Sequence, residues 1–330
     1  MRLPEGMRIH PIDFDSPADL MAGLFDAFTE AHAEIPGPPE TEQHLTYALR
    51  NPEPGARLEG YAWVDGGRVV AAYAQSFVQR DNPHLTWLYP FFVRPDRRRE
   101  GLGTLMLDHV KERARADGRT MVLTEAPVTG TGSAFGHARD FKVAVVEARR
   151  VLDLGRADWE ELQRLMPEAD SYRIELSEGP AGPELLEDLA ALMYGMNDAP
   201  HAEGIEASTF DADLLREREE SIVPRGSHCY TAVARRISDG APAGYTRIHV
   251  DTDRSIGWGK QADTTVLRDH RGHRLGLMLK LANLFHFRDR EPAAERIITW
   301  NATSNAHMLA INEAMGFELL DEWNEWQLTI

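Results

Sequence analysis

The hydrophobic residues of this chain change period several times, and the changes predict its elements. Residues 61–64 and 69–77 flank Asp65-Gly66-Gly67, which predicts a β-hairpin. The next apolar run ends at Val93 and is followed by a Pro-Asp turn, basic residues and two glycines. Apolar residues then recur at helical spacing, at Leu105, Met106 and Val110. The pattern therefore predicts a strand, a glycine-bearing loop and a helix, in that order.

The rest of the chain reads as further short strands and amphipathic helices. Strands are expected at 7–12, 120–124, 143–154, 172–176, 229–235, 244–250, 264–266, 296–300 and 325–330. Helices are expected at 44–50, 184–196, 213–221 and 277–287, and after Ser16, which we expect to cap its helix. This alternation predicts an α/β protein.

The second half of the chain repeats the first. Val93 and Val266, Arg98 and Arg271, and Gly103 and Gly276 are each separated by 173 positions. A constant offset across a strand, a loop and a helix indicates an internal duplication. We therefore expect an N-terminal domain at 1–154, a connector helix at 155–170 and a C-terminal domain at 171–330.

The composition narrows the classes of function. The chain has 330 residues, 42% of them hydrophobic, with 36 Lys and Arg against 53 Asp and Glu, a net charge of −17. This charge argues against nucleic-acid binding and would attract a cationic amine, or it serves solubility alone. The single cysteine, the start without a signal peptide and the lack of a long apolar run predict a cytoplasmic protein outside the membrane.

The loop after Val93 has the chemistry of a phosphate site. A helix start presents free backbone N–H groups at the positive end of the helix dipole, and glycines let a ligand approach them. Neither the Gly-Lys-Ser/Thr of a Walker loop nor the three glycines of a Rossmann turn occur here.

The loop resembles the pyrophosphate loop of the GNAT acetyltransferase superfamily, whose pattern is Arg/Gln-x-x-Gly-x-Gly/Ala after a strand. Arg98, Gly101 and Gly103 match it. In the second half Arg271 and Gly276 match, but Arg274 takes the place of Gly101. That arginine either leaves binding intact and adds charge for a phosphate, or it means that binding is reshaped or lost.

The resemblance covers nearly the whole chain. The order of the two halves is similar to the tandem arrangement of domains in actinobacterial enzymes such as mycothiol synthase. It implies two GNAT-like acyl-CoA N-acyltransferase domains, each a mixed, mostly antiparallel sheet flanked by helices and splayed beside its central strand. The implied cofactor is acetyl-CoA or a related acyl-CoA, which would bind in each half. In the first half the implied cofactor-binding residues are Phe92, Val93, Arg98, Arg99, Glu100, Gly101, Leu102, Gly103 and Thr104. In the second half they are Thr265, Val266, Arg271, Gly272, His273, Arg274, Leu275, Gly276 and Asn305.

The second half carries more polar groups that suit acyl transfer. Period-two alternation would place Gln261, Asp263 and Thr265 on one face of a strand, unless a bulge intervenes. Asp263 is our candidate general base, since a carboxylate can take the proton of an amine, although it could equally only bond a neighbouring strand or loop. Asn301 and Asn312 are the other candidate catalytic residues.

The family's usual proton donor is absent from both halves. A tyrosine commonly follows the Leu of a Leu-Tyr-x-x-x-Gly-Phe segment in this family, and Asn312 and Gly136 occupy that position here. His137 and His307 lie nearby but read better as helix-surface residues, and Glu125 as a loop cap. Asn197, Asp198 and His201 fall where the family usually controls substrate access, so they are candidate substrate contacts.

Two further candidates are set aside. Cys229 lies in an apolar strand without a local histidine to activate it, so a core role is favoured. No His or Asp grouping has metal-ligand spacing, so no metal site is expected.

The sequence thus favours an N-acetyltransferase that moves an acetyl group from acetyl-CoA to a primary amine of a small molecule, by direct attack in a ternary complex. The alternative is a non-catalytic acyl-CoA-binding or regulatory protein. The acceptor, the catalytic half and the oligomeric state stay open at this point.

Overall fold

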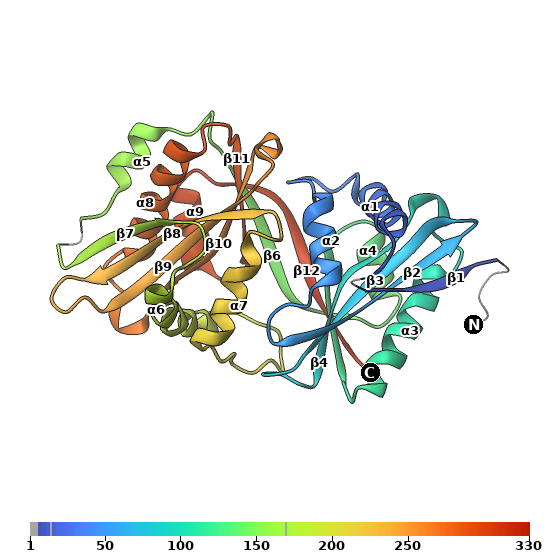
Figure 1. The fold of residues 1–330 in the computed structure, drawn as a ribbon. Coiled ribbons are helices and arrows are strands. Elements are labelled where there is room, and N and C mark those ends of the chain that lie inside the picture. Colours follow the sequence, from blue (N-terminus) through green and yellow to red (C-terminus); the bar gives the residue numbers. More distant parts are fainter. Residues whose placement is uncertain (1–5, 14, 169) are drawn as a thin grey trace. The chain divides into compact units, whose positions relative to one another are not determined.

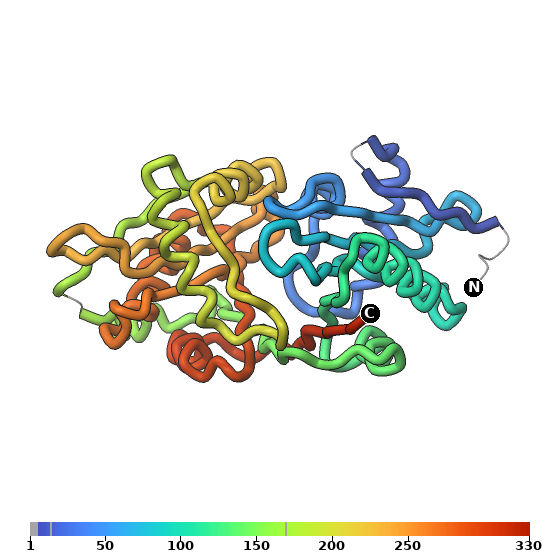
Figure 2. The backbone as a smooth tube through the Cα atoms, turned by 90° about the horizontal axis from the view of Figure 1, so that it is seen from below, coloured from blue at the N-terminus to red at the C-terminus, as the bar shows by residue number. Residues whose placement is uncertain are grey.

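The structure is a computed structural model that describes residues 6–13, 15–168 and 170–330. The chain divides into two compact units (Figure 1 and Figure 2). Unit 1 comprises Met1–Ala144, Ala202–Glu206 and Asn324–Ile330, and unit 2 comprises Val145–His201 and Ala207–Trp323.

Unit 1 is built around a sheet with the strand order β1-β2-β3-β4-β5, and the end of β12 lies beside β5. Its elements are β1 (Arg8–Ile12), α1 (Ala18–His32), α2 (Glu42–Arg50), β2 (Ala56–Asp65), β3 (Arg68–Val78), β4 (Leu85–Val93), η1 (Pro95–Arg97), α3 (Leu102–Ala116), β5 (Met121–Pro127) and α4 (Thr131–His137). β4 and β5 pair in parallel, and the first four strands pair antiparallel.

Unit 2 repeats this plan with the strand order β6-β11-β10-β9-β8-β7. Its elements are β6 (Lys142–Asp153, in this unit from Val145), α5 (Trp159–Leu165), β7 (Tyr172–Glu178), α6 (Pro183–Met193), η2 (Tyr194–Asp198), α7 (Ala212–Ile222), β8 (Ser227–Arg236), β9 (Pro242–Asp251), η3 (Arg254–Ile256), β10 (Trp258–Val266), η4 (Arg268–His270), α8 (Leu275–Arg290), β11 (Arg296–Ala302), α9 (Ala306–Ala314) and β12 (Glu318–Thr329, in this unit up to Trp323). Only β10 and β11 pair in parallel among the strand pairs described for this unit. The predicted α/β fold, with mixed and mostly antiparallel sheets flanked by helices, is confirmed.

In each unit helices cover both faces of the sheet (Figure 1). In unit 1, α3 packs Met106 and Val110 on one face with Leu88, whereas α1 and α2 pack on the other face with Phe92. In unit 2, α8 packs on the face that carries Ile248, and α6 and α7 pack on the face that carries Tyr245.

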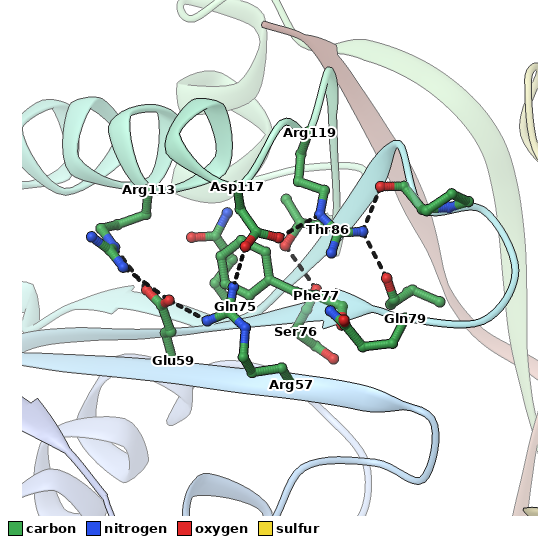
Figure 3. Close-up of polar contacts among 12 residues, drawn as sticks. Arg57, Glu59, Gln75, Ser76, Phe77, Gln79, Thr86, Arg113, Asp117 and Arg119 are labelled. Carbon is green, nitrogen blue, oxygen red and sulfur yellow. Dashed lines mark hydrogen bonds and ion pairs between the residues drawn. The ribbon is translucent and has the colours of Figure 1, made fainter.

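Ion pairs hold the end of α3 and the turn after it against β2. Glu59 accepts hydrogen bonds from Nε and Nη2 of Arg113 at 2.8 and 3.0 Å, and Arg57 reaches Asp117 at 2.7 Å (Figure 3). The Arg113 guanidinium lowers the pKa of Glu59, which keeps this carboxylate charged. These contacts join the end of α3 and the turn after it to β2.

Both central strands contain a bulge at the same place. In unit 1 the pairing moves from Gln75–Leu88 to Tyr73–Phe91, and in unit 2 it moves from Ile248–Gln261 to Thr246–Thr264. The bulged strands are β4 and β10, each with one extra residue. Beyond the extra residue, the side chains of the strand point to the opposite faces from those that simple alternation predicts.

The prediction that Gln261, Asp263 and Thr265 share one face is therefore wrong. Gln261 pairs with Ile248 on the α8 face, whereas Thr265 pairs with Tyr245 on the α6 face. Asp263 accepts a hydrogen bond from Tyr245, so it also lies on the α6 face. In unit 1, Leu88 and Phe92 likewise lie on opposite faces of the sheet.

Ser16 does not cap α1. The position before the helix is Pro17, and the Ser16 hydroxyl instead accepts from Asp13 N–H at 2.9 Å and contacts the Asp13 carboxylate at 3.2 Å. Serine and aspartate side chains often close such local turns in place of a helix cap.

Within the described ranges, no helix has both the length and the apolar character needed to cross a bilayer.

Candidate functional site

The loop of unit 1 joins β4 to α3 through two left-handed residues. Arg99 has φ 70° and Gly101, the residue before α3, has φ 88°. Such backbone favours glycine and turns the chain sharply. The first turn of α3 follows directly, and the first N–H groups of a helix have no partner within it.

The loop of unit 2 has the same backbone with the glycine moved by two positions. Gly272 has φ 88° where unit 1 has Arg99, and Arg274 has φ 56° where unit 1 has Gly101. The backbone of the loop therefore keeps its shape despite Arg274. Both left-handed positions of unit 1 are thus present in unit 2.

The equivalent arginines Arg98 and Arg271 make equivalent bonds to the strand that precedes them. Nε of Arg98 donates to Val93 O at 3.2 Å, and Nε of Arg271 donates to Val266 O at 3.0 Å. Their outer nitrogens differ in partner. Arg98 Nη2 donates to Ala31 O at 3.0 Å, whereas Arg271 Nη2 donates to the Asp198 carboxylate at 2.6 Å.

The other predicted cofactor residues have varied surroundings. Leu102, Leu275, Phe92 and Thr265 are buried, so only their backbone is available to a ligand. Glu100 accepts a hydrogen bond from Arg97, and the His273 ring lies 5.4 Å from that of Tyr172. In unit 1 a Cβ on Gly103 would lie 3.1 Å from Phe135 of α4, and in unit 2 a Cβ on Gly276 would lie 3.4 Å from Ile311 of α9. Each of these helices therefore contacts the start of the helix that follows the loop in its own unit. Thr104 accepts a hydrogen bond from Arg139 at 2.6 Å.

The parallel strands of each unit stay paired over only a few residues. β4 and β5 pair from Leu85–Met121 to Trp87–Leu123. β10 and β11 pair from Trp258–Arg296 to Gln261–Thr299, and both strands continue further. In the described part of the chain the pairing thus ends where the bulge begins, as expected for strands that splay.

Asn301 and Asn312, predicted as catalytic, lie together in unit 2. Asn312 Nδ2 donates to Asn301 Oδ1 at 2.6 Å. Asn312 is fully buried, and its Oδ1 has no hydrogen-bond partner among the described residues. A buried carbonyl without a partner costs free energy, so this atom suits a ligand that brings an N–H group.

Asn305, predicted to contact the cofactor, caps α9. Its side-chain oxygen accepts from the N–H of Met308 at 3.2 Å. This bond uses one lone pair of the amide oxygen and leaves the side-chain N–H₂ for other partners.

Asp263, the third predicted catalytic residue, lies on the α6 face, away from the α8 face on which α9 packs. The Tyr245 hydroxyl donates to Asp263 Oδ2 at 3.0 Å. Burial and, secondarily, the charge of Asp263 raise the pKa of Tyr245 well above its usual value, so it remains a donor. Tyr245 thereby orients a carboxylate that is itself only half-buried.

Unit 1 has apolar or small residues at the equivalent positions. Pro90 replaces Asp263, Ala126 replaces Asn301 and Gly136 replaces Asn312. A Cβ on Gly136 would lie 3.2 Å from the Trp326 ring, so the indole fills that space. The polar set therefore belongs to unit 2.

Sequence reasoning missed Tyr245 and Lys280. Tyr245 lies in a predicted apolar strand and reads as core until the bulge brings it to Asp263. Lys280 is 1% exposed, 5.4 Å from the Phe317 ring centroid, and burial lowers its pKa to about 7. The available signal was a lysine inside an apolar helical stripe, where the first half has Leu107.

The remaining candidates lie outside this set. Cys229 is fully buried and its thiol donates to Gly179 O, which confirms a core role. His137 packs edge-on against Trp326, and His307 is exposed. Within the described ranges, no group of three or more His, Cys, Asp and Glu residues could hold a metal ion.

Comparison with known proteins agrees with this architecture. Residues 22–134 match the Acetyltransferase (GNAT) family. A tandem GNAT protein from the clavulanic acid biosynthesis pathway is 26% identical, with 98% of each chain covered and a TM-score of 0.82. No curated protein matches the sequence significantly.

More distant structures share the fold alone. A GCN5-related N-acetyltransferase from Sphaerobacter thermophilus is 14% identical, with 99% of this chain and 97% of that chain covered and a TM-score of 0.69. A putative acetyltransferase from Pyrococcus horikoshii is also 14% identical, with 100% and 92% covered and a TM-score of 0.62.

The fold and the family match together support acyl transfer in general. Residues 22–134 form a domain of the GNAT acetyltransferase family, and the whole chain has the tandem GNAT fold. GNAT proteins are in general acyltransferases that use acyl-CoA.

Proposed function

We propose that the chain is an N-acetyltransferase that moves an acetyl group from acetyl-CoA to a primary amine of a small molecule, and that unit 2 carries the chemistry. The arrangement of polar groups beside the diverging strands β10 and β11 supports this most directly. Asp263 with Tyr245 lies on one face of the sheet, and the Asn301–Asn312 pair lies with the helices of the other face. A donor and an acceptor can thus approach one gap from opposite sides.

The residues present fit acyl-CoA. The backbone N–H groups at the starts of α3 and α8 suit a diphosphate, and Arg98 and Arg271 add positive charge beside them. The buried Asn312 Oδ1 suits an amide N–H of the pantetheine arm. When bound, acyl-CoA supplies an activated thioester carbonyl.

Asp263 would accept the proton of the attacking amine, directly or through a water. The new bond joins the amine nitrogen to the acyl carbon, the carbon–sulfur bond breaks, and the thiolate takes a proton from solvent. Backbone N–H groups along the unpaired part of β10 would stabilise the developing oxyanion. The net charge of −17 and the Asp263 carboxylate favour a cationic small-molecule amine as acceptor, and we propose a cytoplasmic location.

One observation favours the alternative, a non-catalytic acyl-CoA-binding or regulatory protein. Neither Asn312 nor Gly136 can donate a proton to the departing thiolate as a tyrosine would. Turnover separates the two functions, because a binding protein holds CoA without releasing thiol from acetyl-CoA.

The experiment is a screen of small amines with acetyl-CoA in which the free thiol is followed. We expect amine-dependent thiol release that drops about 100-fold or more in Asp263→Asn, the size typical of a lost general base. Asp289→Asn, an exposed carboxylate at the end of α8, should release thiol at the wild-type rate. Tight CoA binding without release for any amine would overturn the enzyme proposal.

A further inference from the structure

The carboxylate of Asp198 lies between two arginines of the loop before α8. Arg268 Nη2 donates to its Oδ1 at 2.9 Å, and Arg271 Nη2 donates to its Oδ2 at 2.6 Å. All three side chains are partly open to solvent, with 36% of Asp198, 77% of Arg268 and 45% of Arg271 exposed. Solvent-exposed ion pairs are weak, about 0–1 kcal/mol, so a stronger anion can replace this carboxylate.

Among the described residues of unit 1, no carboxylate contact of this kind is found at the equivalent loop arginine, although the loop is otherwise equivalent. Arg98 repeats the bond of Arg271 to the preceding strand, but its outer nitrogen meets the neutral carbonyl of Ala31. The carboxylate against the loop arginines is therefore an addition of unit 2, the unit with the polar site.

Asp198 ends η2 (Tyr194–Asp198), which lies against the last residues of β10. A Cβ at Gly195 would overlap Thr265 Oγ1, so the glycine allows the closest approach. Thr265 pairs with Tyr245, the partner of Asp263, and thus lies on the face from which the amine would approach. Asn197, also in η2, is held separately, because its side chain exchanges hydrogen bonds with the backbone of Ser208 at 2.9 and 3.0 Å.

A diphosphate at the start of α8 would compete with Asp198 for the same arginines and would repel it as a like charge. If the diphosphate displaces η2, and η2 influences how the amine binds, then each of the two ligands changes the affinity of the other by the same factor. The site of the diphosphate and the α6 face are thereby linked through η2.

We propose that Asp198 latches η2 onto the loop before α8, and that the diphosphate of acyl-CoA releases it. This inference rests on the proposed acyl-CoA site of unit 2. It makes Asp198 a residue that controls the release of η2 without touching the reacting atoms.

The test uses Asp198→Asn in the full chain, with Arg98→Ala added to weaken the loop of unit 1. The matched control is Asp213→Asn, an exposed carboxylate on α7 that pairs with Arg216. Without Asp198 to compete, we expect CoA to bind about fivefold tighter by calorimetry, a coupling of ordinary size. The control should bind CoA as the parent does.

Amide hydrogen exchange supplies a second readout. In the parent, CoA should speed exchange at 194–198, and in Asp198→Asn exchange there should be fast already without CoA. Unchanged or weaker CoA binding in Asp198→Asn, or an η2 that CoA does not loosen, would overturn the latch and leave the proposed function standing. If the parent binds no CoA in unit 2, both proposals fail.

Discussion

Lys280 lies in α8 among apolar side chains, where unit 1 has Leu107. Burial disfavours the charged ammonium, and the Phe317 ring is the one contact described for it. The surroundings described for Lys280 therefore offer little to stabilise its charged form.

We predict that Lys280→Leu stabilises unit 2 near neutral pH. The pKa falls to about 7 in the folded state, so above pH 7 the unfolded chain binds a proton that the folded chain does not. Each unit of this depression costs about 1.4 kcal/mol, and the cost is largest at and below pH 7 and vanishes above the unfolded pKa of about 10.4. Urea unfolding at pH 7 and pH 9.5 should show a gain that shrinks with rising pH, whereas the exposed Lys142→Met should show none.

Arg98 offers a test of the cofactor loop in unit 1. We predict that Arg98→Ala weakens CoA binding about tenfold, as expected when a charge-assisted hydrogen bond is lost. Calorimetry measures it, and circular dichroism checks that the fold survives the loss of the bonds to Val93 and Ala31. Arg115→Ala, at the exposed end of α3, is the control, and unchanged affinity in Arg98→Ala would refute the assignment.

Single residues show where sequence reasoning reaches its limit. Asn301 and Asn312 were predicted from a family pattern, and the structure brings them together. The partner of Asp263 could not be predicted, because the bulge shifts the alternation by one and no residue type marks it. Lys280 was missed because a lysine in a helix is usually a surface residue.

At the scale of elements, the two loops show one backbone path served by different residues. Both need two left-handed positions, and each places glycine at only one of them, Gly101 in unit 1 and Gly272 in unit 2. The sequence pattern requires glycine at the position of Gly101, so the loop of unit 2, with Arg274 there, matched it only in part. Local sequence could not show that Arg274 adopts the same backbone, since arginine seldom does.

Gly272→Ala tests this backbone requirement. Because φ is 88° and nothing lies within 4 Å of a new Cβ, only the left-handed conformation opposes the change. We predict a loss of about 1–2 kcal/mol in the stability of unit 2, measured by urea unfolding. Gly276→Ala has no positive φ and an ordinary 3.4 Å contact, so it should cost less, and equal losses would contradict this account.

At the scale of the whole molecule, the units are not continuous in sequence. The duplication was predicted from the constant offset, because equivalent strands, loops and helices repeat in order. The membership of the last strand was beyond the sequence, because Asn324–Ile330 belongs to unit 1 although it follows unit 2. Apolar alternation predicts a strand there but does not name its neighbour.

Trp326 tests this membership. It is 1% exposed in the apolar cluster under α3, whereas Leu319, on the same strand, is 54% exposed. We predict that Trp326→Ala destabilises unit 1 by about 3–5 kcal/mol and Leu319→Ala changes stability by about 0.5 kcal/mol at most. Hydrogen exchange should speed up in α3 and stay unchanged in α8, and loss of protection in α8 alone would contradict the assignment.

The release of thiol from acetyl-CoA by paired loop variants tests the central claim most directly. If unit 2 carries the chemistry, Arg271→Ala lowers amine-dependent turnover about tenfold at acetyl-CoA concentrations well below saturation, as expected when a charge-assisted hydrogen bond is lost, whereas Arg98→Ala leaves it unchanged. Loss of turnover in Arg98→Ala with full activity in Arg271→Ala would place the chemistry in unit 1 and contradict the account.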